Sequence, residues 1–222
     1  MEVRFTLYDV IDDIERDSAR VLARESLIAL SAYLHGFKDE LGELGAWLKP
    51  ESPPFYEFNR WVADRLGRGL TEEGWVRSIV ATEPDDSKRL HCFFELLHEF
   101  RYSKASRSAP DQDIKNLITS RRLESIYDVV DRIRIRPGMF LGECSLSALD
   151  AYLRGARDGA RMAGEQLLKE KPEFSQFGEW IAQKFERNET DWRIQIEAFS
   201  GNAEEALAQF FLLLDQYRRA GM

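Results

Sequence analysis

Carboxylate side chains gather at three places along the chain, and such groups can bind metal ions, act as acid–base pairs or attract a basic protein. Acidic residues are also favoured at helix starts, where the helix dipole is positive, and this accounts for the second and third groups without any function. We expect these acidic groups to lie at helix starts exposed to solvent. If a basic protein docks on this chain, they are the first contact sites to test. The candidate partner-binding residues are Asp12, Asp13, Asp17, Glu83, Asp85, Asp86, Glu204 and Glu205.

The three histidines offer little further chemistry. His91 and His98 lie seven residues apart on one expected helix, and His35 lies on another. His98 is close enough in sequence to Glu95 and Glu99 for an acid–base couple, but no nucleophile or orienting group accompanies them. Surface or half-buried histidine is the default expectation, so no catalytic residue and no metal site is predicted.

The two cysteines, Cys92 and Cys144, cannot form a structural zinc site on their own and indicate a reducing compartment. The sequence also lacks a Walker motif, a dinucleotide-binding fingerprint, a serine-hydrolase elbow and a Cys-x-x-Cys pair. We therefore expect no cofactor, and binding is favoured over catalysis.

The formal net charge of −8 argues against nucleic-acid binding, because phosphate neutralisation needs a surplus of Lys and Arg. It permits an acidic surface that attracts a basic protein. The start of the chain has no basic segment followed by an apolar run, and the apolar stretch 210–214 is too short to span a bilayer. The expectation is a cytoplasmic protein without a membrane partner.

The chain aligns with itself when it is shifted by 119 residues, and a deletion of two residues keeps the register further on. About two in five positions are identical before that deletion, which indicates a duplication. The prediction is a first repeat unit at residues 1–104, a polar linker at 105–122 and a second unit at 123–222. The matched segments include 8–12 with 127–131, 33–36 with 152–155, 53–61 with 172–180, and 90–97 with 207–214.

Apolar residues at helical spacing predict about five helices in each unit, and thus an all-α fold of two tandem pseudo-repeated bundles. In the first unit, helices are expected at 8–14, from Ser26 to about Leu48, and from Pro53 onward, with a last helix through residues 90–97. Ser26 and Ser145 are the expected N-caps of the long helices. Residues 192–198 alternate like a strand, but the Trp and Ile that both copies share lie four apart, which favours helix.

The most distinctive local string is Arg136, Pro137, Gly138, Met139, Phe140, Leu141 and Gly142. Pro137 ends the preceding helix and the glycines permit tight bends, so the string is expected to connect two helices, with residues 139–141 tucked under the long helix. A similar string occurs in the ATPase domain of type II topoisomerases. No Gly-rich nucleotide segment follows here, which excludes that comparison.

The second copy, from about residue 127 to 218, resembles small, uncharacterised bacterial helical proteins that open with Arg-Pro-Gly-Met-(Tyr/Phe)-(Leu/Ile)-Gly. They continue through a Ser-x-x-x-Leu helix and a Trp segment and close on a Phe-Phe-x-Leu-Leu helix. The first copy matches except for the opening string, which residues 16–23 replace. The resemblance associates the chain with the pool of small bacterial proteins in which toxin-immunity partners are common.

Two classes of function follow from these observations. One is an immunity protein that neutralises a bacterial toxin by direct binding, with the toxin presenting a basic surface. The alternative is a small-ligand-binding module or an enzyme with its site between the two helical units, because domain interfaces favour such pockets.

Overall fold

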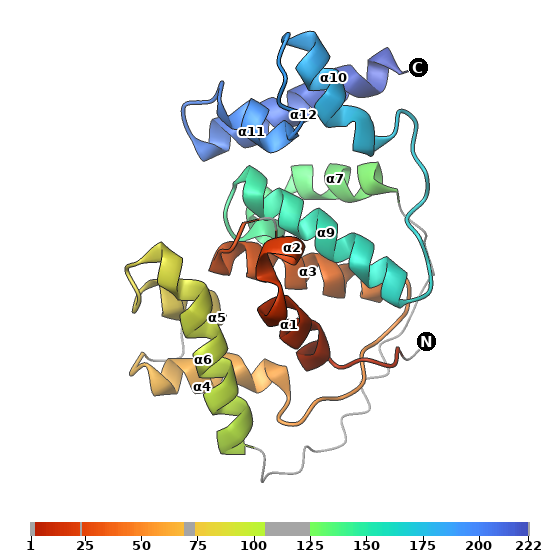
Figure 1. The fold of residues 1–222 in the computed structure, drawn as a ribbon. Helices are drawn as coiled ribbons and strands as arrows, with labels where there is room; N and C mark the ends of the chain where they lie inside the picture. Colours follow the sequence, from red (N-terminus) through yellow and green to blue (C-terminus); the bar gives the residue numbers. More distant parts are fainter. Residues whose placement is uncertain (1–2, 23, 69–73, 105–124, 222) are drawn as a thin grey trace. The chain divides into compact units, whose positions relative to one another are not determined.

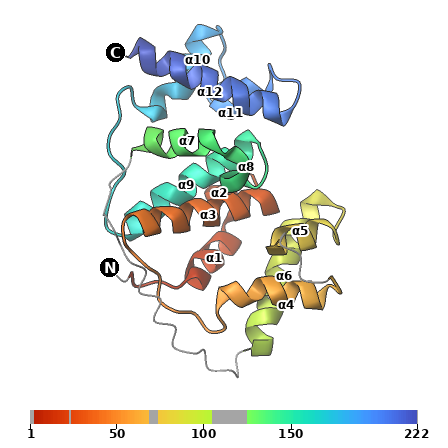
Figure 2. The ribbon, with the colours of Figure 1, turned by 180° about the vertical axis from the view of Figure 1, so that it is seen from behind.

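The computed structural model describes residues 3–22, 24–68, 74–104 and 125–221. Within these ranges it contains α-helices and two short 3-10 helices but no β-strand, which confirms the all-α prediction (Figures 1 and 2). The predicted linker at 105–122 lies outside the described residues. The helices are α1 (Leu7–Arg16), α2 (Ser18–Leu22), α3 (Leu27–Glu43), η1 (Phe55–Glu57), α4 (Phe58–Arg65), α5 (Gly74–Val80), α6 (Asp86–Lys104), α7 (Ile126–Ile135), α8 (Pro137–Leu141), α9 (Leu146–Met162), η2 (Phe174–Gln176), α10 (Phe177–Lys184), α11 (Trp192–Glu197) and α12 (Ala203–Ala220).

The chain forms two compact units. The first contains residues 1–31 and 45–121, and the second contains 32–44 and 122–222. Helix α3 is therefore divided: its first turn belongs to the first unit, and its remainder packs with α9 in the second. Figures 1 and 2 both show α3 and α9 side by side.

Each copy of the sequence repeat begins with a capped amphipathic helix. Thr6 caps α1 and Ser125 caps α7, in each case with a reciprocal hydrogen bond to the aspartate three residues later. The buried face of α1 consists of Leu7, Tyr8, Val10, Ile11 and Ile14, and that of α7 consists of Ile126, Tyr127, Val129, Val130 and Ile133. The buried residues of the two helices have the same spacing, so side chains at equivalent positions enter the two cores.

The long helices begin as expected. The hydroxyl oxygen of Ser26 accepts the backbone N–H of Ala29 at 3.1 Å, and Ser145 does the same for Ala148 at 3.2 Å. The predicted end of α3 at Leu48 is wrong, because the helix stops at Glu43. Gly45 lies just beyond with a φ of +61°, a conformation that costs glycine little and ends a helix.

The third helix does not open at the prolines. Pro53 and Pro172 lie in the loops before η1 and η2, and α4 and α10 start only at Phe58 and Phe177. The carbonyl oxygen of each proline instead accepts a tyrosine hydroxyl, from Tyr8 at 2.6 Å and from Tyr127 at 2.5 Å. The prolines thus fasten the loop to the first helix rather than starting the next one.

Aromatic rings fill the core that α4, α5 and α6 form. The ring of Phe58 lies 5.6 Å from Phe93 and 5.4 Å from Phe100, and Trp75 lies 4.7 Å from Phe93. Each of these large rings removes much apolar surface from water, which stabilises the fold. The helices α10, α11 and α12 hold a similar cluster, formed by Phe177, Trp180, Trp192, Phe210 and Tyr217.

The ambiguous segment around Trp192 is helical. It forms α11, which Asp191 caps by accepting the backbone N–H of Arg193 at 2.9 Å. Within α11, Ile196 is fully buried whereas Ile194 is 53% exposed, so the alternation in the sequence does not reflect a two-faced strand.

Candidate functional site

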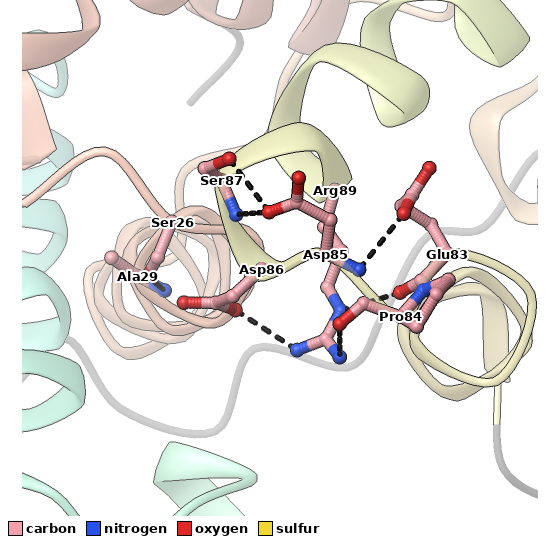
Figure 3. Close-up of polar contacts among 8 residues, drawn as sticks. All are labelled: Ser26, Ala29, Glu83, Pro84, Asp85, Asp86, Ser87 and Arg89. Carbon is pink, nitrogen blue, oxygen red and sulfur yellow. Dashed lines mark hydrogen bonds and ion pairs between the residues drawn. The ribbon is translucent and has the colours of Figure 1, made fainter.

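The acidic residues at 83–86 form the capped start of α6 (Figure 3). Asp85 accepts the backbone N–H of Ser87 at 3.1 Å and its hydroxyl at 2.7 Å, and these hydrogen bonds lower the pKa of Asp85. Asp86 binds Arg89 at 2.9 Å, and the Arg89 guanidinium also donates to the carbonyl oxygen of Glu83. This group is therefore organised by contacts within its own turn, as capping chemistry requires.

The acidic residues of the first helix face basic partners on the same unit. Asp12 pairs with Arg101 of α6 at 2.6 Å. Asp13 pairs with Arg16 at 2.7 Å, and Asp17 pairs with Arg20 at 3.0 Å. The latter two pairs are exposed and contribute little to stability, so their charges stay accessible.

The third acidic group, Glu204 and Glu205, lies at the start of α12. Asn202 caps the helix by accepting the backbone N–H of Glu205 at 2.9 Å, and the carboxylate of Glu205 accepts the N–H of Gly201. Glu204 is exposed. No group of three or more metal-ligating side chains occurs in the described part of the chain.

The histidines are surface residues with single carboxylate neighbours. His98 does not couple to Glu95 or Glu99; its Nε2 lies 3.0 Å from Glu15 of α1. Glu95 instead neighbours His91, and Glu99 pairs with Arg65. Glu99 lies 100° around the helix from His98, and Glu95 is engaged by His91 four residues earlier, so His98 contacts a carboxylate of another helix instead.

The string 136–142 forms the end of α7, the short helix α8 and the bend after it. Leu141 is buried, and the ring of Phe140 packs 6.0 Å from that of Tyr152 on α9. Met139 does not tuck under the long helix as expected, because its side chain is 57% exposed. Gly142 has a φ of +68°, which permits the bend.

The exposed large apolar side chains of the second unit include Ile135 at 77%, Met139 at 57% and Leu212 at 52%. A contiguous exposed apolar patch is typical of a protein-binding surface, whereas single exposed apolar side chains are common on any protein. The aligned residues of the first copy are charged: Arg16 aligns with Ile135, Arg20 with Met139, and Glu95 with Leu212. Arg16 and Arg20 are paired with Asp13 and Asp17, and Glu95 neighbours His91. The two copies thus differ in polarity at these three solvent-facing positions.

Arg134 fastens this region of α7 to α12. Its guanidinium donates to the carbonyl oxygen of Phe211 at 2.7 Å, pairs with Asp215 at 3.0 Å and lies 4.8 Å from the centre of the Phe211 ring. Ile135 follows Arg134 and Leu212 follows Phe211, so the contact joins the segments that carry two of the exposed side chains. We name Ile135, Met139 and Leu212 the apolar triad.

The sequence prediction included Met139 only within the connecting string, as a buried residue, and did not include Ile135 or Leu212. Hydrophobic periodicity assigns apolar residues to cores, and nothing in one copy alone distinguishes a buried isoleucine from an exposed one. Comparison of the aligned copies could have predicted this exposure. A position that is arginine in one copy is not a core position of the shared fold.

The part of α3 that belongs to the second unit packs against α9 at very short range. A Cβ atom added to Gly36 would lie 2.2 Å from the carbonyl oxygen of Tyr152, and one added to Gly155 would lie 2.0 Å from that of Tyr33. Only glycine permits the two backbones to approach so closely.

No helix in the described part of the chain is long and apolar enough to span a membrane. Comparison with protein-family models, with curated proteins and with solved structures found no match for this chain.

Proposed function

We propose that the chain consists of two copies of one helical unit, at residues 1–104 and 123–222, each with about five main helices. Matched contacts support this interpretation. The hydrogen bond from Tyr8 to Pro53 has its counterpart in that from Tyr127 to Pro172, and the Arg101–Asp12 pair corresponds to Arg218–Asp131 at 2.9 Å. A duplicated chain can retain its fold while one copy acquires a new surface.

We further propose that the protein is a cytoplasmic immunity protein, which binds and neutralises a bacterial toxin with a basic surface. The apolar triad carries the proposal, because it exposes hydrophobic side chains where the first copy keeps charged residues. Interfaces concentrate affinity in a few central apolar residues, whereas surrounding charges set the rate and specificity of encounter.

The charge distribution matches that division of roles. The net charge of −8 favours a cationic partner. The exposed acids that could attract one are Asp13, Asp17, Asp86, Glu204 and Glu205. Their local hydrogen bonds hold several carboxylates in fixed positions, as the capped turn of Figure 3 illustrates for residues 83–86.

The test begins with the product of the neighbouring gene, expressed together with this chain. We expect a stable complex, and protection of cells from the neighbour's toxicity. The variants Ile135→Arg and Met139→Arg introduce the residues that the first copy carries, and each is expected to weaken the complex about tenfold or more. Because the first copy tolerates arginine at these positions, folding is expected to persist.

The matched control is Ile194→Arg, which changes another exposed isoleucine of the second unit. It is expected to leave affinity within about twofold of wild type. Equal losses for Ile194→Arg and Ile135→Arg would remove the triad from the interface. The absence of both a complex and protection would exclude the immunity role.

A further inference from the structure

A hollow of about 260 Å³ lies in the second unit, between α9, the start of α7 and the loop that precedes η2. Its size is somewhat below that of sites for drug-sized molecules, so it suits a smaller ligand. Apolar side chains and charges of both signs share its wall. The lining residues are Ile126, Arg157, Leu167, Leu168, Lys169, Glu170, Glu173 and Ser175.

Arg157 is the main cation of this wall and makes no hydrogen bond or ion pair with any other described residue. Its guanidinium lies 5.8 Å from the centre of the Phe174 ring. Burial among the surrounding atoms lowers the pKa of Arg157, and the nearby charges of Glu170 and Asp150 oppose that effect. A guanidinium remains charged at neutral pH, so Arg157 can offer N–H donors to an anion at the hollow.

The opposite wall is held in place by contacts from three directions. Leu168 forms a parallel backbone bridge with Ser125, and the carboxylate of Glu170 accepts the backbone N–H of Phe174 at 3.1 Å. The carbonyl oxygen of Glu173 accepts the hydroxyl of Tyr217 at 2.7 Å. Such bracing fixes the site before a ligand arrives, which reduces the entropy lost on binding.

The charges of the lining favour a ligand with one carboxylate and one ammonium group over a ligand with two negative charges. A guanidinium with free donors binds a carboxylate in a bidentate manner, whereas the carboxylates of Glu170 and Glu173 repel a second negative charge and attract an ammonium group. Ile126, Leu167 and Leu168 provide a surface for a short hydrocarbon chain. We propose that this hollow binds a small zwitterion, namely an α-amino acid with an aliphatic side chain, whose carboxylate lies on Arg157 and whose ammonium group faces the two glutamates.

The aligned positions of the first copy lack this combination. Lys38 replaces Arg157, Pro54 replaces Glu173 and Tyr56 replaces Ser175. A lysine offers a point charge instead of a planar fork, and proline offers no carboxylate. Ligand binding is therefore a property of the second unit alone, and it does not depend on the proposed toxin partner.

Isothermal titration calorimetry with the full chain tests the assignment, with L-leucine as the probe. We expect saturable binding of L-leucine and at least about tenfold weaker binding of 4-methylpentanoate, which lacks the ammonium group, and of 3-methylbutylamine, which lacks the carboxylate. Binding of inorganic phosphate in place of leucine would overturn the choice of a zwitterion. Absence of saturable heat with L-leucine would overturn the proposal.

Two variants use residues that the first copy already carries. Arg157→Lys keeps the charge but removes the bidentate fork, and Ser175→Tyr fills the hollow; each is expected to weaken leucine binding about tenfold or more. The matched control is Arg154→Gln, one turn earlier on α9, where the arginine pairs with Asp150 at 2.8 Å. Unchanged far-ultraviolet circular dichroism identifies folded variants, and folded variants that bind leucine like wild type would contradict the site.

Discussion

The hydroxyl of Tyr152 donates a hydrogen bond to the carboxylate of Asp39 at 2.6 Å, and the aligned residues reverse the relationship, because Tyr33 donates to Asp158 at 2.7 Å. Burial and the bond to Asp39 both raise the pKa of Tyr152, which keeps the phenol protonated as a donor. Each long helix thus donates one tyrosine hydrogen bond to the other helix and accepts one from it. This reciprocity is the pattern of an isologous interface, in which residue i meets j and j meets i.

Removal of one donor is expected to destabilise this helix pair. Tyr152 is fully buried and Asp39 is 32% exposed at its side chain, so Tyr152→Phe loses a hydrogen bond to a charged group whose acceptor stays partly solvated. The expected loss is about 1–2 kcal/mol in the free energy of unfolding, measured by urea denaturation. The control Tyr102→Phe changes a tyrosine that is 89% exposed and is expected to alter stability by less than about 0.5 kcal/mol. Equal effects of the two substitutions would contradict the reciprocal bond.

The close approach of α3 and α9 predicts a sharp difference between two glycines. Gly155→Ala places a methyl group 2.0 Å from the backbone oxygen of Tyr33, and a backbone cannot yield as a flexible side chain does. Its stability is expected to fall by about 1–3 kcal/mol or more. Gly42→Ala meets no atom within 4 Å on an exposed face of α3, so it is expected to stabilise the protein by about 0.5–1 kcal/mol. Both values come from urea denaturation, and a stable Gly155→Ala variant would mean that the helices lie further apart.

Much of the fold follows from local patterns in the sequence. Ser26 and Ser145 signal their helices because a side-chain oxygen before an apolar stripe satisfies a free backbone N–H. The helical state of α11 follows from the spacing of Trp192 and Ile196. The start of α4 did not follow, because the carbonyl oxygen of Pro53 is used by Tyr8, which lies 45 residues away. A contact between residues so far apart in the sequence cannot be predicted from the pattern of neighbouring residues.

The surface was harder to predict than the core. Acidic residues such as Asp85 were expected at solvated helix starts and named as candidate partner contacts. Asp85 does cap its own helix, through hydrogen bonds from Ser87. Met139 was expected to be buried and Arg157 was not selected. The exposure of Met139, and the lack of a hydrogen-bonded partner for Arg157 among the described residues, depend on how several helices meet. Residue type predicts what a side chain can do, whereas packing decides whether it is free to do it.

The exposed acids are expected to control the rate at which the proposed partner arrives. Glu204→Lys reverses a charge at the solvent-facing start of α12. We expect a decrease in the association rate constant of about two- to fivefold at low salt, with little change in dissociation, and convergence with wild type at high salt. Surface plasmon resonance against the identified partner separates the two rate constants. A faster dissociation instead would place Glu204 inside the interface, and no change in either rate would exclude it as a steering charge.

The capping box of α1 predicts a pH-dependent contribution to stability. Hydrogen bonds from the backbone N–H and hydroxyl of Thr6 lower the pKa of Asp9 below its ordinary value. A carboxyl group whose pKa is lower in the folded state stabilises the fold above the unfolded pKa of about 4, and this contribution is lost as the pH falls through the folded value. Asp9→Asn is therefore expected to cost about 0.5–1 kcal/mol at pH 7, measured by urea denaturation, and progressively less below pH about 4. Asp64→Asn, at an exposed position of α4, is the control and is expected to show no such loss. A penalty for Asp9→Asn that stays constant from pH 7 to pH 3 would mean that the ionised carboxylate does not supply the cap.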